Sequence, residues 1–457
     1  MKTLNFFEQS LLNKYDTSGP RYTSYPTALE FSDNFGNEEL ERAGGLSANK
    51  ELSLYIHIPF CHSLCYYCGC NKIVTRHRDK ADIYLDYLEK EIITRALTFG
   101  SRPIRQLHLG GGTPSFLSHE QLSRLINTLR QYFSFCADME MSIEVDPREI
   151  ELELAAHLAS IGFNRLSIGV QDTNEKVQKA INRPQSTEFI KLFIERAKQV
   201  GFSSVNIDLI YGLPHQTVET FSQTLIDVTK ELDADRISLF SYAHMPNIFA
   251  AQRKIRDEWL PSADDKFALM KLAIETLCRH GYEFIGMDHF AKPTDELAKA
   301  QRNGQLHRNF QGYTTQGDYD LLGLGGSAIS SVGDVYSQNF KTLKDYYQQI
   351  DGQGHGVFKG LRLSQDDQIR RMVIKELMCN LFLDKATVEQ AFSINFEQYF
   401  RDDLLSLSPF IKDGLLSNTA ESIRVSPRAR LLIRNICMSF DAYLKNHLNQ
   451  QRFSRVI

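Results

Sequence analysis

The chain has 457 residues, 42% of them hydrophobic and 24% charged, and its formal net charge is −4. This composition is that of a globular protein with enough apolar material for one large α/β domain with attachments or for two to three domains. The slight negative charge gives no electrostatic reason to expect nucleic acid or an anionic membrane surface as the partner, and no apolar run reaches the roughly 20 residues that span a bilayer.

A polar N-terminal arm, residues 1–50, comes first in chain order. Its opening stretch lacks the features of a signal peptide, so we expect a cytoplasmic protein. The segment "GPRYTSYPT" at 19–27 has too many aromatic residues and too rigid a backbone for a simple flexible tail. Within it, the guanidinium of Arg21 could bind a carboxylate through two parallel hydrogen bonds, which makes this residue a candidate for ligand binding.

The next part of the chain predicts an α/β domain over residues 51–345. Between residue 52 and about residue 290, short apolar runs alternate with segments whose apolar residues recur every three or four positions. Six or seven such β-α units predict a parallel sheet, folded into a complete or partial (β/α) barrel with its chemistry at the carboxyl ends of the strands. The predicted strands are 52–58, 105–110, 140–145, 165–170, 205–210, 236–242 and 282–287.

The last region, residues 346–457, is rich in predicted helices. Residues 411–436 resemble a helix, a short hairpin and another helix, as in a winged helix. Modules of this kind bind DNA or only pack against a neighbouring domain. Because the chain has no strong basic excess, we do not expect this module to bind DNA.

Four of the eight cysteines lie in "FCHSLCYYCGC" at 60–70, directly after the first predicted strand, while the other four stand singly. Soft thiolates in a reducing compartment bind zinc or iron–sulfur clusters. Structural zinc sites usually draw two of their ligands from farther away, whereas Cys61, Cys65 and Cys68 place three ligands within eight residues. This spacing suits three corners of a four-iron cluster and leaves one iron open. A zinc site that also uses Cys70 and a redox-active cysteine pair are the alternatives.

Glycine and polar residues stand at the carboxyl ends of other predicted strands. The "GGGTP" turn at 110–114 leaves backbone N–H groups free to meet a carboxylate or hydroxyl. Tyr55 and His57 share one face of the first strand. Asp208 is a charge within an otherwise apolar strand, where burial without a partner is costly. The other candidates are Glu144, Gln171 and Arg183.

The C-x3-C-x2-C spacing resembles the defining motif of the radical S-adenosylmethionine superfamily. Together with "PRYTSYPT", "LHLGGGTP", "SIEVDPRE", "NIDLIYGLP" and "HRNFQGYTTQ", it is similar to the oxygen-independent coproporphyrinogen III oxidases, over nearly the whole chain to the terminal "FSRVI". The resemblance implies conversion of two propionate side chains of coproporphyrinogen III to vinyl groups, giving protoporphyrinogen IX. In that family a 5′-deoxyadenosyl radical, formed when the cluster reduces S-adenosylmethionine, removes a β-hydrogen from each propionate.

The resemblance also implies cofactors and partners. The cofactors would be a 4Fe–4S cluster on Cys61, Cys65 and Cys68, with one open iron, and two molecules of S-adenosylmethionine. The enzyme would be a monomer that uses an external electron donor and an external electron acceptor. It would bind no nucleic acid and would not span a membrane.

Residue roles follow from the same resemblance. The molecule of S-adenosylmethionine on the cluster is expected to contact Tyr55, Tyr67, Gly111, Glu144 and Ile329. The second molecule is expected to contact Gly112, Thr113, Gln171, Arg183, Asp208 and Ala243. The catalytic candidates are Tyr55, His57, Cys70, Glu144 and Arg21. The N-terminal arm is expected to act as a lid that closes over the tetrapyrrole substrate.

Two alternatives stay open at this point. A relative that binds and transfers haem without decarboxylase activity shares the barrel, but typically lacks the fourth cysteine and the "PRYTSYPT" arm. Both features are present here, which favours the oxidase. The more distant alternative is a zinc-stabilised regulator that uses the C-terminal module.

Overall fold

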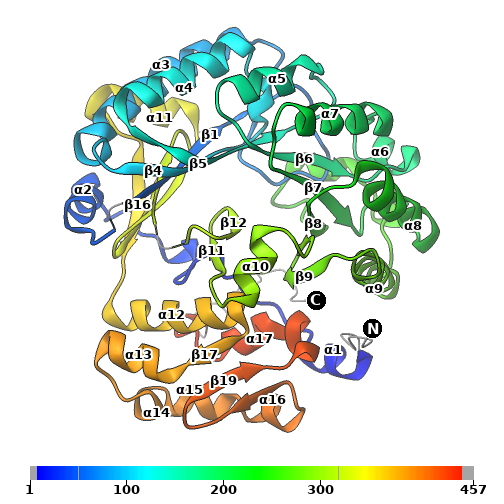
Figure 1. Cartoon of the computed structure of the whole chain (residues 1–457), viewed down its shortest axis with the longest axis vertical. Coiled ribbons are helices and arrows are strands. Elements are labelled where there is room, and N and C mark those ends of the chain that lie inside the picture. The colour runs from blue at the N-terminus through cyan, green and yellow to red at the C-terminus, as the bar shows by residue number, and fades with distance from the viewer. Residues whose placement is uncertain (1–7, 50, 318, 445–457) are drawn as a thin grey trace.

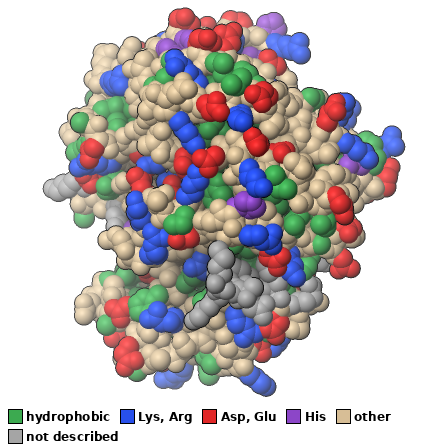
Figure 2. Space-filling view, turned by 45° about the vertical axis from the view of Figure 1, so that its right-hand side comes forward, with side chains coloured by type: hydrophobic (Ala, Val, Ile, Leu, Met, Phe, Trp, Pro, Cys, Tyr) green, Lys and Arg blue, Asp and Glu red, His purple; other side chains and the backbone are tan. Residues whose placement is uncertain are grey.

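The computed structural model describes residues 8–49, 51–317 and 319–444, so the terminal "FSRVI" lies outside the described residues. A twelve-stranded sheet with helices on its outer face forms the larger part of the molecule, and a smaller C-terminal region lies below it in Figure 1. Within the described ranges, no helix is long and apolar enough to cross a membrane. On the face shown in Figure 2, basic and acidic side chains are interspersed.

Seven neighbouring strands of the sheet are parallel, in the order β13-β1-β4-β5-β6-β7-β8. Six of them confirm predicted strands: β1 (Leu52–Ile58), β4 (Pro103–Gly111), β5 (Ser134–Val145), β6 (Arg165–Gln171), β7 (Ser204–Tyr211) and β8 (Arg236–Ser241). Their apolar residues form one continuous core with the helices on the outer face. These helices are α3 (Asp79–Phe99), α4 (His119–Tyr132), α5 (Glu153–Ser160), α6 (Glu175–Ala180), α7 (Thr187–Gln199), α8 (Val218–Ile226) and α9 (Ala263–Arg279).

The seventh predicted strand, 282–287, is present but does not pair directly with a parallel neighbour. It forms β9 (Glu283–Gly286), which turns back through two residues into β10 (His289–Ala291). β10 pairs antiparallel with both β9 and β8. β9 therefore runs in the same direction as β8, after the crossover helix α9, but the antiparallel β10 lies between them.

The opposite edge of the sheet contains strands that the sequence did not predict. β13 (Asp320–Leu324) pairs parallel with β1 and is followed by three antiparallel strands. These are β14 (Ile329–Val332), β15 (Val335–Asn339) and β16 (Val357–Arg362), with α11 (Leu343–Gln353) before the last. The division between the barrel and the C-terminal region stays a prediction, and we would place it after Arg362 because β16 belongs to the large sheet.

The sheet is an open, partial barrel. Among the described strands, the two at its edges, β16 and β9, are not paired with each other. The hairpin of β11 (His307–Asn309) and β12 (Gly312–Thr314) lies below the concave side of the sheet, next to α10 (Glu296–Arg302) (Figure 1). Gln106 Nε2 of β4 lies 3.5 Å from Thr314 Oγ1, which connects the hairpin to the inner face of the barrel.

The C-terminal region has a second hydrophobic core. Its helices are α12 (Gln365–Asn380), α13 (Lys385–Phe392), α14 (Phe396–Tyr399), α15 (Arg401–Ser406), α16 (Ser408–Lys412) and α17 (Ile433–Met438). The predicted hairpin is present as β18 (Leu416–Asn418) and β19 (Ser422–Val425), and β17 (Phe382–Asp384) adds a third antiparallel strand.

The first part of the described N-terminal arm belongs to this second core, whereas Leu40 and Ala43 of its later part belong to the core of the large sheet. The arm contains α1 (Gln9–Tyr15) and, nearer the sheet, α2 (Asn37–Leu46). The ring of Tyr15 stacks on Phe410 with centroids 4.6 Å apart, and the Tyr22 hydroxyl donates to Asp441 at 2.9 Å. Arg434 Nε donates to the carbonyl of Pro20 at 2.9 Å. The described arm is therefore a packed segment between the two parts of the molecule.

Candidate active site

The cysteine loop starts where β1 ends. After Pro59, the short strand β2 (Phe60–Cys61) pairs parallel with β3 (Ile73–Val74), so the loop from residue 62 to 72 is closed at its base. Cys61 and Cys65 are buried, Cys68 is half-buried and Cys70 is exposed. All four thiols are free of disulfides. Because β1 is central in the sheet, the loop lies at the functional edge of the barrel.

Each of the three predicted ligand sulfurs accepts a hydrogen bond. Cys61 Sγ accepts from Thr113 Oγ1 at 3.3 Å, and Cys68 Sγ accepts from the backbone N–H of Cys70 at 3.4 Å. Cys65 Sγ accepts from two guanidinium groups, those of Arg148 and Arg183, both at 3.3 Å. Hydrogen bonds to sulfur stabilise thiolates and tune the potential of iron–sulfur clusters.

This donor set fits a 4Fe–4S cluster better than a single metal ion. Within the part of the chain that the structure describes, no three His, Cys, Asp or Glu side chains come close enough to hold one ion. Thiolates on a cluster are more widely spaced, because each binds a different iron of the cube. Cys70 differs from the other three. A hydrogen bond between the Cys70 and Cys68 side chains, together with the charge of Lys72, lowers the pKa of Cys68 to about 6. The same side-chain hydrogen bond raises the pKa of Cys70.

A buried ionic group lies beside the loop. Asp146, just after β5, accepts from Arg148 Nη2 at 2.6 Å and from Arg183 Nη1 at 3.1 Å. Burial alone would raise the pKa of Asp146, but the two guanidinium groups outweigh it and lower this pKa to about 2. Arg183 also donates from Nη2 to the carbonyl of Gly169 at 2.6 Å. The predicted second-cofactor residue Arg183 thus lies directly against Cys65.

The predicted residues of the first cofactor molecule meet on the inner face of the sheet. Tyr55 lies opposite His108 in the β1–β4 pair, and their rings stack with centroids 5.9 Å apart. The Tyr55 hydroxyl is 3.1 Å from His57 Nδ1. Glu144 accepts from the backbone N–H of Gly111 at 3.2 Å and lies 3.4 Å from His108 Nε2. Burial raises the pKa of Glu144, but these two partners outweigh it, so the carboxyl stays ionised.

The glycine turn brings the backbone close to this group. Gly111 has φ +116°, and a Cβ there would lie 2.6 Å from the ring of His57. A Cβ on Gly112 would lie 2.7 Å from the backbone of Pro59. Neither position accepts a side chain without displacement of the cysteine loop or of His57.

Gln171 and Asp208 lie on the neighbouring strands. Gln171 is buried and has φ +68°, which is unusual for a residue other than glycine and marks strain at a functional edge. Asp208 lies opposite Gly169 and accepts from Asn206 Nδ2 at 2.8 Å. Burial, and then the charge of Glu144, raise the pKa of Asp208 to about 7. A carboxylate held in this way is suited to a cationic ligand.

Asp208 yields a prediction about stability. A carboxyl whose pKa is higher in the folded protein stabilises the fold at low pH and loses that contribution as the pH rises, here from about 4 to about 7. Asp208→Asn should therefore match the wild type near pH 4. At pH 8 it should be more stable by about 1–2 kcal/mol, with a discount for partial exposure. Urea unfolding of the apoprotein at both pH values measures this difference. A gap that does not change with pH would contradict the assigned environment of Asp208.

The other predicted residues are more dispersed. Tyr67 is half-buried beside Arg183 and Cys65, and its carbonyl accepts from Gln252 at 2.9 Å. The same Gln252 amide donates to the carbonyl of Ala243 at 3.2 Å, after β8. Ile329 begins β14 next to Gly323, the strand partner of Tyr55. Arg21 is 45% exposed and pairs with Asp288 at 3.5 Å, away from the cysteine loop.

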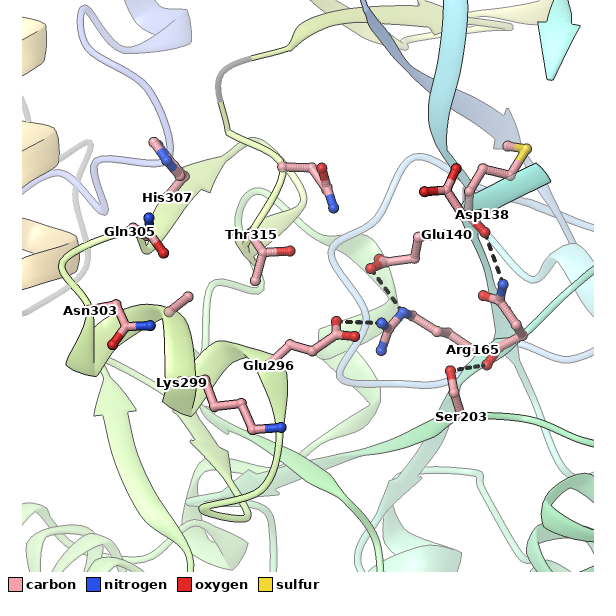
Figure 3. A pocket seen from close by; sticks show the side chains of 14 residues that line it. Asp138, Glu140, Arg165, Ser203, Glu296, Lys299, Asn303, Gln305, His307 and Thr315 are labelled. Atoms are coloured by element: carbon pink, nitrogen blue, oxygen red, sulfur yellow. Dashed lines mark hydrogen bonds and ion pairs between the residues drawn. The ribbon is translucent and has the colours of Figure 1, made fainter. Parts of the chain in front are cut away.

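A polar cavity of about 680 Å³ lies at the other end of the barrel. It is formed at the amino ends of β5, β6 and β7 together with α10 and the β11–β12 hairpin. Figure 3 shows Arg165 between Glu140 and Glu296, with N–O distances of 2.8 and 2.5 Å. Since the cysteines lie at the opposite, carboxyl ends of the strands, this cavity is not the reaction site.

Three residues of the site were not among the candidates predicted from the sequence. His108 stands within "LHLGGGTP", and Asp146 and Arg148 stand within "EVDPRE". The signal was present, because each follows a predicted strand or lies on its inner face. Their partners, Tyr55 and Cys65, are more than 50 residues away in sequence, so only the fold identifies the contacts.

Comparison with known proteins agrees with this geometry. Residues 55–228 match the family model of the radical SAM superfamily, and residues 363–432 match that of the HemN C-terminal domain. An oxygen-independent coproporphyrinogen III oxidase from Escherichia coli (strain K12) is 57% identical over 99% of this chain and 98% of its own. A Synechocystis protein of the same name is 46% identical over 99% and 98%. A solved structure described as coproporphyrinogen III oxidase (HemN) from Escherichia coli, a radical SAM enzyme, superposes with a TM-score of 0.93 at 56% identity, covering 96% of this chain and 99% of that one.

Proposed function

Because this chain belongs to the family of oxygen-independent coproporphyrinogen III oxidases, within the radical SAM superfamily, we propose that it converts coproporphyrinogen III to protoporphyrinogen IX without oxygen. Two propionate side chains become vinyl groups, with loss of two molecules of carbon dioxide. The observation that carries this proposal is the set of three hydrogen-bonded thiols at the carboxyl end of β1.

Cys61, Cys65 and Cys68 would hold a 4Fe–4S cluster. When bound, the cluster and S-adenosylmethionine supply a carbon-centred radical that removes a hydrogen atom from the substrate. The residues of the chain bind and orient the substrate and the cofactors, and they exclude water from the site. Arg148 and Arg183 surround Cys65 with positive charge, and Thr113 donates to Cys61.

Two molecules of S-adenosylmethionine are part of the proposal. Glu144, held between the N–H of Gly111 and His108, would accept the amino group of the molecule on the cluster. The second would lie between the ends of β6 and β7, where the carboxyl of Asp208 is available to a positive group. His57 and Tyr55, in contact at 3.1 Å, would line the space between the radical and the propionate.

The remaining predictions belong to the same proposal. The enzyme would act as a monomer in the cytoplasm, with an external electron donor and an external electron acceptor. A haem-transfer role is not favoured, because the chain keeps both Cys70 and the "PRYTSYPT" segment.

The proposal is tested by anaerobic incubation of the reconstituted protein with coproporphyrinogen III, S-adenosylmethionine and a chemical reductant. We expect a tetrapyrrole with two vinyl groups and a matching amount of 5′-deoxyadenosine, and loss of both after exposure to air. Tight binding of haem without any vinyl product would overturn the proposal in favour of haem transfer.

A further inference from the structure

Three arginines from distant parts of the chain converge beside β10. Arg21 comes from the arm, Arg308 from β11 and Arg434 from α17. All three lie around Asp288: Arg21 Nη2 is 3.5 Å from its carboxylate, and the charges of His289, Arg308 and Arg21 together hold its pKa well below the usual range despite burial. Burial and the neighbouring Arg21 lower the pKa of Arg434 to about 10. Three guanidinium groups thus face one carboxylate.

Arg308 has unused hydrogen-bonding capacity. Its guanidinium lies over the ring of Tyr313, with Cζ 4.6 Å from the ring centroid. Its Nε and Nη1 atoms are buried, and within the described part of the chain neither has a hydrogen-bond partner. A buried charged donor without a partner is destabilising, so such an arrangement is retained where a ligand supplies the acceptor.

This arginine cluster adjoins the inner face of the barrel. His289 lies opposite Ser238 of β8, and the Ser238 hydroxyl donates to Asn206, which in turn donates to Asp208. The ring of Phe240 lies edge-on to His289, with centroids 6.4 Å apart. At the end of β7, burial raises the pKa of Tyr211, and the charges of Arg21 and Arg434 oppose that rise. The cluster is therefore one strand away from the proposed second-cofactor position.

We propose that Arg308, together with Arg21, binds a carboxylate of the tetrapyrrole that is not being oxidised. The inference rests on the proposed function, because coproporphyrinogen III carries four propionates. The Nε–H and Nη1–H of Arg308 are charged donors on different sides of the planar guanidinium, and either can bind a carboxylate oxygen. Arg434 holds the arm through the carbonyls of Gly19 and Pro20 and so keeps Arg21 beside Asp288.

The test compares Arg308→Gln and Arg308→Lys with the wild-type holoenzyme. The matched control is Arg302→Gln, because Arg302 is an exposed arginine on α10 that pairs with Glu283. The probe is coproporphyrin III, whose dissociation constant is measured by fluorescence titration. The dissociation constant for S-adenosylmethionine is measured in the same samples by equilibrium dialysis.

We expect Arg308→Gln to weaken coproporphyrin III binding about tenfold or more, as expected for loss of charged hydrogen bonds, and Arg308→Lys to weaken it less. Binding of S-adenosylmethionine should not change, and Arg302→Gln should change neither constant. Unchanged coproporphyrin III binding in Arg308→Gln would overturn the inference. So would weaker binding of S-adenosylmethionine, which would assign Arg308 to the cofactor. If Arg308→Gln does not fold, Arg308→Lys decides. Turnover by the wild type tests the proposed function separately.

Discussion

Replacement of Cys61, Cys65 or Cys68 by serine is expected to give protein that contains no iron–sulfur cluster and produces no 5′-deoxyadenosine. Each thiolate would hold one iron of the cube, and a cluster with two protein ligands is not retained. The effect should be complete in all three variants. Iron and sulfide analysis of anaerobically reconstituted protein, with its absorption near 400 nm, measures the loss.

Cys70 provides the internal comparison for this experiment. It is exposed, and its backbone N–H donates to the sulfur of Cys68. Cys70→Ser should therefore keep the cluster but impair turnover. Cys278→Ser, on α9 away from the loop, should keep both. Loss of iron in Cys70→Ser would show that the fourth thiol is a ligand and that our division of roles is wrong.

Arg183→Met is expected to lower the free energy of unfolding of the apoprotein by about 3 kcal/mol, at the lower end of the range for removal of one partner from a buried ion pair. The side chain of Arg183 is 6% exposed and joins Asp146, Cys65 and the carbonyl of Gly169. Its loss leaves Asp146 with only Arg148 and leaves the carbonyl of Gly169 without its donor. Urea unfolding at neutral pH, where Asp146 is ionised, gives the value.

The part of this effect that comes from the pair with Asp146 is isolated by making the same change in an Asp146→Asn background. Arg148 has lost its carboxylate in both Asp146→Asn proteins, so Arg183→Met should cost less stability there than in the wild type. Arg302→Met, on the surface, should change stability by less than about 0.5 kcal/mol. If Arg183→Met unfolds like Arg302→Met, the ion pair of Arg183 with Asp146 does not stabilise the fold.

The central strands could be predicted because each is a short run of β-branched and aliphatic residues followed by an amphipathic helix. β13 to β15 could not, because four glycines and several serines interrupt the apolar runs of "LLGLGGSAISSVGDV" at 321–335. The pairing of β13 also depends on β1, where Leu52 lies opposite Asp320 from a distant part of the chain. The antiparallel β10 between β8 and β9 was not predicted for a related reason. A two-residue turn at Met287 and Asp288 has no strong signal in the sequence, and Met287 adopts φ +50°.

The site was predictable to the extent that its signals are local. The spacing of Cys61, Cys65 and Cys68 and the glycine turn are read within a few residues of a strand end. The two arginines on Cys65 are contributed by segments 83 and 118 residues away, and no local pattern indicates them. The arm was recognised as more than a tail, but its packing against α17 and Phe410 depends on the C-terminal core.

The most direct test of the proposed reaction uses coproporphyrinogen III with deuterium at the β-carbons of its propionates, in an anaerobic turnover followed by mass spectrometry of the 5′-deoxyadenosine. We expect the 5′-deoxyadenosine to gain deuterium in step with vinyl formation. Cys61→Ser, Cys65→Ser and Cys68→Ser should give neither product. Vinyl products accompanied by 5′-deoxyadenosine without deuterium would contradict the proposed reaction.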